Sequence, residues 1–331
     1  MQGDGRLTGD WPLRCGLALL ALLSVAPLLA WVYGLGEFST WYWRVAAPAL
    51  IVLVVAAVAI ARNEAKAPLH RAIVAGAVGG FVGTIAYDLF RLPFLAGGLR
   101  LLAPIDSYGV LLLDAVGSSG RTGMAGWFFH FANGVCFGIA YAVIAAGRHW
   151  GWGIAWAMVL ETATVATPFA SLYGLTERPI IIGIAYLAHL PYGYAVGRFA
   201  QQPEATANMI RDFAPRFGTT ILFTASALAL LLWQRPWSTS AILATGEAVA
   251  PGPSAVIHGN GQMSPSWVRV PVGGCAAIRN DTDRPIDFAG TPVDPGTVGR
   301  VCFDHADVQR VKIGGRAWSG GFVIVDGEQD R

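Results

Sequence analysis

The sequence predicts an α-helical membrane bundle of seven transmembrane helices, followed by a small all-β sandwich. Of the 331 residues, 54% are hydrophobic and only 13% are charged, about half the charged share of a typical soluble protein. Long apolar runs recur before residue 235, which is the pattern of membrane-spanning helices. After residue 266, apolar and polar residues alternate in short runs, as they do in strands. We therefore expect a transmembrane domain, 1–237, and a β domain, 266–331.

Seven apolar runs are each close to the ~20 residues that a helix needs to cross a bilayer. The first run follows Arg6 and Arg14 and lacks a convincing cleavage site, so we expect an uncleaved first helix. The predicted spans are 13–34, 44–62, 70–91, 123–146, 152–173, 179–199 and 217–234.

The distribution of Arg and Lys predicts the orientation in the membrane. If the N-terminus lies inside, the inner segments carry more Arg and Lys than the outer connections, in agreement with the positive-inside rule. Seven spans then place the C-terminal β domain outside. We expect a protein of the bacterial cytoplasmic (inner) membrane.

The connection between the third and fourth spans, about 92–122, is not plainly polar. Its apolar groups include 101–104 and 110–113. They predict a short helix that lies on the outer surface rather than a re-entrant segment.

Residues 238–265 are rich in Ser, Ala, Gly and Pro and predict a linker. Short period-two runs separated by turn residues follow this segment, and they predict a small antiparallel sandwich. The predicted strands are 267–272, 275–280, 300–303, 308–313 and 322–325.

Several short motifs of the β domain resemble those of the cupredoxin-like fold. They are Val272-Gly273-Gly274, Asn280-Asp281-Thr282-Asp283, Pro295-Gly296 and Gly320-Gly321-Phe322-Val323-Ile324-Val325. In that family a copper-binding His follows the Asn-x-Asp turn, but Pro285 and Ile286 stand there in this sequence. The Cys-x-x-His of Cys302 and His305 comes one strand too early. The resemblance implies the fold, and the missing ligands lead us to expect no cofactor in this domain.

The two cysteines of the β domain, Cys275 and Cys302, predict a structural disulfide. The domain is expected on the oxidising side of the membrane. Small domains also gain the most from a covalent cross-link, because their cores are limited.

The membrane part resembles a widespread, uncharacterised group of multi-helix bacterial membrane proteins over roughly residues 70–200. The resemblance is carried by Tyr87-Asp88-Leu89-Phe90-Arg91-Leu92-Pro93, by His130-x2-Asn133-Gly134-x2-Phe137-Gly138-x2-Tyr141 and by His189-x2-Tyr192-Gly193. It implies no activity.

Ionisable residues within the spans are the candidate site, because such groups are costly in a bilayer. Two histidines and a carboxylate, His130, His189 and Glu161, are candidate ligands of a divalent metal. A proton relay or a quinone head-group site uses the same residue types. Other polar residues of the spans include Asp88, Arg91, Asn133 and Tyr192.

A structural interpretation of these residues is open beside the functional one. His130 and His189 each begin the pattern His-x3-Gly-x3-Gly, which lets helices pack closely while the histidine bonds to a neighbour. Glu161 is expected to pair with a histidine, and Asp88 with Arg91. The repeated pattern also predicts a duplicated helical hairpin.

The sequence favours a non-catalytic membrane protein that presents its β domain as an accessory or partner-docking subunit. No nucleophile–base pair or phosphate-binding motif is evident. The expected partners are the lipid bilayer and other subunits of a membrane complex. Nucleic acid is not expected, because the net charge is only +2. A metal or redox-cofactor protein and an ion- or proton-coupled transporter are the alternatives.

Overall fold

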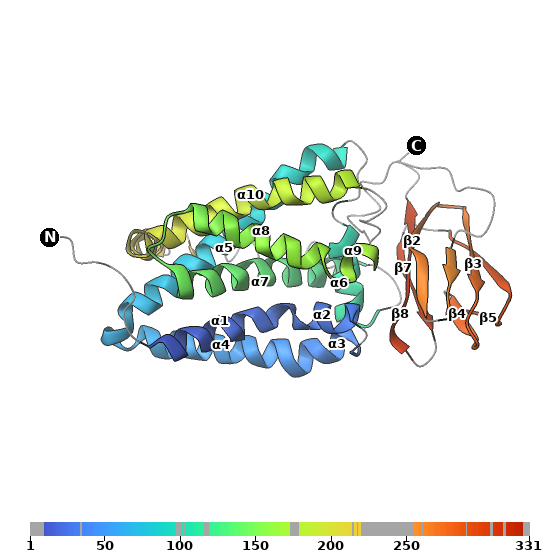
Figure 1. The fold of residues 1–331 in the computed structure, drawn as a ribbon, viewed down its shortest axis with the longest axis horizontal. Coiled ribbons are helices and arrows are strands. Elements are labelled where there is room, and N and C mark those ends of the chain that lie inside the picture. The colour runs from blue at the N-terminus through green and yellow to red at the C-terminus, as the bar shows by residue number, and fades with distance from the viewer. Residues whose placement is uncertain are drawn as a thin grey trace.

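The computed structural model describes residues 10–33, 35–96, 101, 103–115, 119–172, 179–213, 215–216, 218–219, 255–259, 261–288, 290–304, 307–313 and 316–326. Long helices lie side by side in one part of the molecule, and strands form the other part (Figure 1). The helical part comes first along the chain and the β part last.

Five stretches of the described chain are long and apolar enough to cross a membrane, so this is a multi-span membrane protein. They match five of the seven predicted spans. The first contains α1 (Trp11–Leu22) and α2 (Ala26–Val32); the second contains α3 (Phe38–Trp41) and α4 (Ala47–Ala61). The others contain α5 (Ala67–Ala96), α7 (Gly120–Ala145) and α10 (Pro179–Gln201).

The prediction of seven spans was wrong for the described chain. Helix α8 (Gly151–Val165) has only 15 residues, and the short helix α9 (Phe169–Leu172) follows it. The break lies at Pro168, which has no backbone N–H and restricts the residue before it. The seventh predicted span, 217–234, lies almost wholly outside the described residues.

The main helix contacts join α4 to α1, α1 to α7, α7 to α5, α5 to α10 and α10 to α8, and further contacts join α4 to α5 and α7 to both α10 and α8. Glycines allow the close approach of α5 and α7. A Cβ atom on Gly80 would lie 2.3 Å from the carbonyl oxygen of Gly134, and one on Gly138 would lie 2.3 Å from that of Gly76. Backbones can approach so closely only where both helices carry very small residues.

Helix α6 (Ala103–Leu112) is the short helix predicted between the third and fourth spans. It is buried rather than laid on the surface, because Ile105, Val110 and Leu111 are each at most 2% exposed. It packs on α7 and α3 and contacts strand β7, so the backbone at this end of the bundle is enclosed by protein.

The β part is one mixed sheet with the strand order β5-β4-β7-β8-β2-β1-β3-β6. The prediction of a purely antiparallel arrangement was wrong, because β1 pairs with β3, and β2 with β8, in parallel. The first of these parallel pairs involves β1, a strand that the sequence pattern missed and that lies between β2 and β3. The strands are β1 (Ala255–Ile257), β2 (Gln262–Pro271), β3 (Cys275–Asn280), β4 (Ile286–Phe288), β5 (Thr291–Val293), β6 (Val298–Cys302), β7 (Asp307–Ile313) and β8 (Arg316–Asp326).

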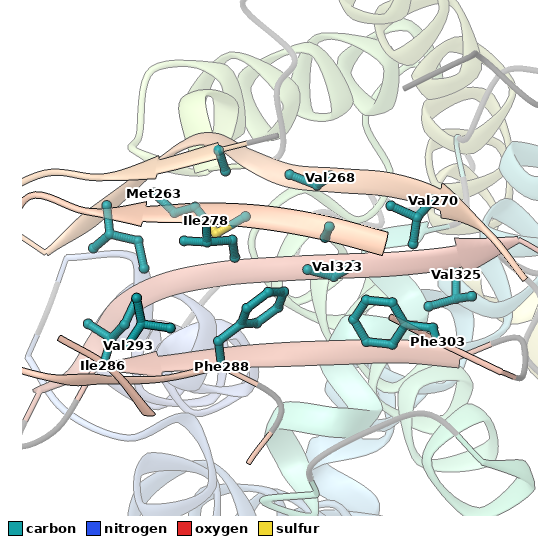
Figure 2. Close-up of a cluster of buried hydrophobic side chains, with 13 residues drawn as sticks. Met263, Val268, Val270, Ile278, Ile286, Phe288, Val293, Phe303, Val323 and Val325 are labelled. Carbon is teal, nitrogen blue, oxygen red and sulfur yellow. The ribbon is translucent and has the colours of Figure 1, made fainter. Parts of the chain in front are cut away.

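The sheet curls so that its two edge strands meet. Val293 of β5 lies directly against Gly299 of β6, where a Cβ atom would come within 2.1 Å of the valine side chain. Apolar side chains from both halves of the curled sheet form one core, which Figure 2 shows between the strands. Ile257, Ile278 and Phe288 of this core are fully buried.

The predicted disulfide is confirmed. Cys275 of β3 and Cys302 of β6 are bonded and are direct partners in the ladder between these strands. A disulfide persists in an oxidising compartment, which indicates that the β part is extracytoplasmic. Two cysteines outside the β part, Cys15 and Cys136, are free.

Glycine packing predicts a large difference between two substitutions in α10. A Cβ atom at Gly193 would meet the backbone of α8 at 2.7 Å, whereas one at Gly183 has open space around it. We expect Gly193→Ala to lower stability by about 1–3 kcal/mol through overpacking, and Gly183→Ala to be neutral or slightly stabilising. Thermal unfolding of the detergent-purified protein compares the two; equal transition temperatures would contradict the packing.

The disulfide predicts both the location and the stability of the β part. In a Cys15→Ser, Cys136→Ala background, a membrane-impermeant maleimide should label intact cells only after reduction. Removing the disulfide in a Cys275→Ala, Cys302→Ala variant should lower the free energy of unfolding by about 2–5 kcal/mol. Labelling without a reductant would show that the bond is not formed, and labelling only of lysed cells would place the β part inside.

Candidate functional site

A cavity of about 210 Å³ lies among the four helices α5, α7, α8 and α10. Leu28 of α2, Ile105 of α6 and Phe169 of α9 line it as well. All three predicted metal-ligand residues, His130, His189 and Glu161, lie in its wall. The tertiary structure therefore brings together the polar groups that the sequence places on three separate helices. The lining residues are Val25, Leu28, Thr84, Tyr87, Arg91, Leu101, Pro104, Ile105, Tyr108, Phe129, His130, Asn133, Gly134, Phe137, Leu160, Glu161, Thr164, Phe169, Ile181, Ala185, His189 and Tyr192.

The first histidine is held by a charged cluster at the end of α5. The His130 Nε2 atom lies 3.1 Å from both carboxylate oxygens of Asp88. Arg91 forms the predicted ion pair with Asp88 and donates a 2.8 Å hydrogen bond to the carbonyl of Leu101. The guanidinium also lies 4.2 Å from the centre of the Tyr87 ring. Asp88 itself sits behind the cavity wall with two positively charged or chargeable partners.

The second histidine is paired with the second carboxylate. The Nδ1 atom of His189 lies 3.4 Å from a carboxylate oxygen of Glu161 and 2.8 Å from the carbonyl oxygen of Ala185. The side chain of Glu161 is only 4% exposed. Among the described residues, His189 is its one ionisable partner within ion-pair distance. The expected pairing of Glu161 with a histidine is therefore confirmed.

The hydrogen bonds determine which nitrogen of each ring carries a proton. A carbonyl oxygen only accepts, so the Nδ1 of His189 must donate to Ala185. The Nε2 of His130 donates in the same way to the carboxylate of Asp88. In the neutral rings, Nε2 of His189 and Nδ1 of His130 are then acceptors. Neither atom forms a hydrogen bond within the described part of the chain.

An aromatic residue connects the two histidines. The Tyr87 ring lies 4.8 Å from the His189 ring and 6.2 Å from the His130 ring, measured between centroids. Tyr192 of α10 crosses to α7, where its hydroxyl donates a 2.8 Å hydrogen bond to the carbonyl of Gly134. These contacts fix the distance between the two halves of the cavity wall.

Two polar atoms of the wall are buried without a hydrogen bond among the described residues. They are the side-chain oxygen of Asn133 and the Nε of Arg91. The Asn133 amide nitrogen donates to the carbonyl of Phe129 at 2.9 Å, which assigns the orphan atom as the oxygen. Such an atom costs about 1–3 kcal/mol and marks a place where a ligand can supply the missing partner.

The two helix pairs share one construction, in keeping with the expected duplication. Gly80 precedes Asp88 by eight positions, and Gly153 precedes Glu161 by eight. A Cβ atom on Gly134 would meet Thr84 and the Gly80 carbonyl, and one on Gly193 would meet Ala157 and the Gly153 carbonyl. Both pairs thus place a carboxylate against the histidine that lies one turn before the glycine contact.

The described residues contain no group of three or more His, Cys, Asp or Glu side chains close enough to hold a metal ion. His130, His189 and Glu161 line the same cavity, but each histidine faces its own carboxylate. A divalent metal bound by all three residues stays a prediction.

Sequence reasoning missed several residues of the wall. Tyr87 was noted only within a motif, although it separates the two histidines. The equivalence of Thr164 to Arg91 was also missed: Thr164 follows Glu161 by three positions, as Arg91 follows Asp88, and aligning the two hairpins would have revealed this spacing. Tyr108 and Phe169 lie on short helices whose position depends on tertiary packing.

Comparisons with protein-family models, with curated proteins and with solved structures found no match. The site is therefore interpreted from its own geometry.

The buried charge cluster predicts strong coupling between Asp88 and Arg91. Asp88→Asn leaves the guanidinium buried without a counter-ion and should cost about 3 kcal/mol. Asp88→Asn combined with Arg91→Gln should cost clearly less than the sum of the two single changes. The free energies of unfolding in detergent are compared for wild type, Asp88→Asn, Arg91→Gln and the double variant, which together form a double-mutant cycle. Glu204→Gln, which removes the exposed partner of Arg71, is the control and should cost under about 1 kcal/mol; additive effects at Asp88 and Arg91 would contradict the cluster.

Proposed function

We propose that this is a ligand-binding membrane protein whose helical part holds a small molecule in the cavity between the two histidine–carboxylate pairs. The observation that carries the proposal is the convergence of His130, Glu161 and His189 on one cavity. Ionisable groups inside a membrane bundle are costly and are functional candidates by default. The orphan oxygen of Asn133 in the same wall supports a ligand.

The histidine–carboxylate pairs support binding more than helix packing alone. The glycine contacts already hold the helices together, and they lie one and two turns away from the histidines. One ring nitrogen is held by the Asp88 carboxylate in His130 and by the Ala185 carbonyl in His189, and the second nitrogen is left available. This arrangement is found behind metal-binding and proton-accepting histidines. A divalent metal and a proton relay are consistent with this chemistry.

Partner docking through the β part is the second candidate. Strand β8 contacts α2, β7 contacts α6, and β2 contacts α9. Each of these three helices also contributes to the cavity wall, and Figure 1 shows the strands beyond that end of the bundle. A partner that binds the β part would thus act on the helices that enclose the ligand. The proposed arrangement has the N-terminus in the cytoplasm and a cupredoxin-like sandwich as the docking domain. Because β1 and the start of β2 lie within the predicted linker 238–265, only the part of it before Ala255 is proposed as a linker.

A cavity-filling substitution tests the ligand-binding function. Ala185 lines the cavity, so Ala185→Phe should fill it. Leu187→Phe adds the same ring on the same helix at a position that is 49% exposed, and it is the control. A panel of small molecules is compared by thermal shift with the full-length protein in detergent. We expect a ligand that stabilises wild type and Leu187→Phe but not Ala185→Phe. Equal responses of the two variants to every compound would contradict the proposal.

A further inference from the structure

The charges in the cavity wall are not balanced between its two halves. Asp88 is neutralised by Arg91 and is also hydrogen-bonded to His130. Glu161 has no such cation: the residue three positions on is Thr164, and its hydroxyl donates to the carbonyl of Leu160. When His189 is neutral and Glu161 is ionised, the cavity therefore carries one uncompensated carboxylate.

The hydrogen-bonding atoms of the wall that lack a partner are mostly acceptors. They are the free ring nitrogens of His130 and His189 and the orphan oxygen of Asn133, a residue that is 8% exposed. The Glu161 carboxylate adds two more acceptor atoms. Arg91 keeps an orphan donor at its Nε, but its charge is already balanced by Asp88, so it offers an anionic ligand no unbalanced positive charge. A ligand that fits this wall donates several hydrogen bonds and carries a positive charge.

The remaining wall favours an apolar body on that ligand. Tyr108, Phe129 and Phe137 line the cavity, and aromatic faces attract cations as well as apolar groups. The volume of about 210 Å³ is more than ten times the ~10–15 Å³ of such space that one water molecule needs. The space therefore exceeds what a proton or a bare ion needs.

We propose that the cavity binds a small primary amine in its protonated form, with the ammonium group at Glu161, His189 and Asn133 and a compact apolar body against the aromatic side chains. The three N–H groups of an ammonium match the unpaired acceptors, and its charge balances Glu161. The proposal rests on the ligand-binding function proposed above, and it names the class of ligand.

The test compares two ligands of the same shape that differ in charge. The probes are 2-phenylethylamine and its neutral analogue 2-phenylethanol, each titrated by calorimetry into the full-length protein in detergent at neutral pH. We expect the amine to bind at least tenfold more tightly than the alcohol. Glu161→Gln should bring the ratio of the two affinities close to one, and Glu161→Asp should keep the preference for the amine. Glu64→Gln removes an exposed carboxylate and is the matched control.

The outcomes separate this proposal from the ligand-binding function on which it rests. Equal binding of amine and alcohol to wild type, abolished by Ala185→Phe, would overturn the amine specificity and leave a ligand site. If neither probe binds, but another compound stabilises wild type and not Ala185→Phe, the amine specificity is likewise overturned and a ligand site remains. Stoichiometric Zn²⁺ binding that displaces the amine and is lost in His189→Ala would also overturn it, in favour of a metal. The comparison on wild type needs no variant, so the test holds even if Glu161→Gln fails to fold.

Discussion

The close contact of helix backbones at paired glycines is the constraint on which the rest of the helical part depends. Gly80 against Gly134, and Gly153 against Gly193, bring backbones so near that a single Cβ atom would collide. Helix association in a bilayer lacks a strong hydrophobic drive and depends on such packing. Because the helices are rigid, the contact also fixes what happens two turns away on α5 and α8. There Asp88 and Glu161 must face the histidines that begin the same glycine pattern.

Local pattern predicted the parts of the structure that depend on short stretches of sequence. Spans of about 20 apolar residues, the disulfide of Cys275 with Cys302 and the pairing of Glu161 with a histidine all follow from composition, spacing or the cost of a buried charge. The break at Pro168 also has a local cause, but the apolar residues on both sides of it concealed the end of α8. Hydropathy alone does not register a missing N–H.

The features that the sequence did not predict depend on contacts between distant segments. Strand β1 has three residues, too few to produce a period-two pattern, yet it forms one of the two parallel pairs of the sheet, and the other joins the distant strands β2 and β8. Residue type predicted that His130, His189 and Glu161 were candidates. Only the packing of α5 between α7 and α10 shows that Tyr87 stands between the two histidines. Helix α6 looked like a surface element because its burial against α7 is a tertiary property.

The two hairpins share their geometry but not their charge, and this difference gives the cavity its chemistry. A fully symmetric pair would carry an arginine after each carboxylate, and both halves would be neutral and saturated. Arg91 neutralises Asp88, whereas the Thr164 hydroxyl donates a hydrogen bond to a backbone carbonyl of its own helix. The first half therefore acts as a fixed electrostatic support for His130. The second half keeps a carboxylate whose balance depends on His189 or on a ligand. A buried charge without a partner is strongly unfavourable. Glu161 is therefore the residue of the cavity that gains most from a positively charged partner, and the helices that the β part contacts line the same cavity.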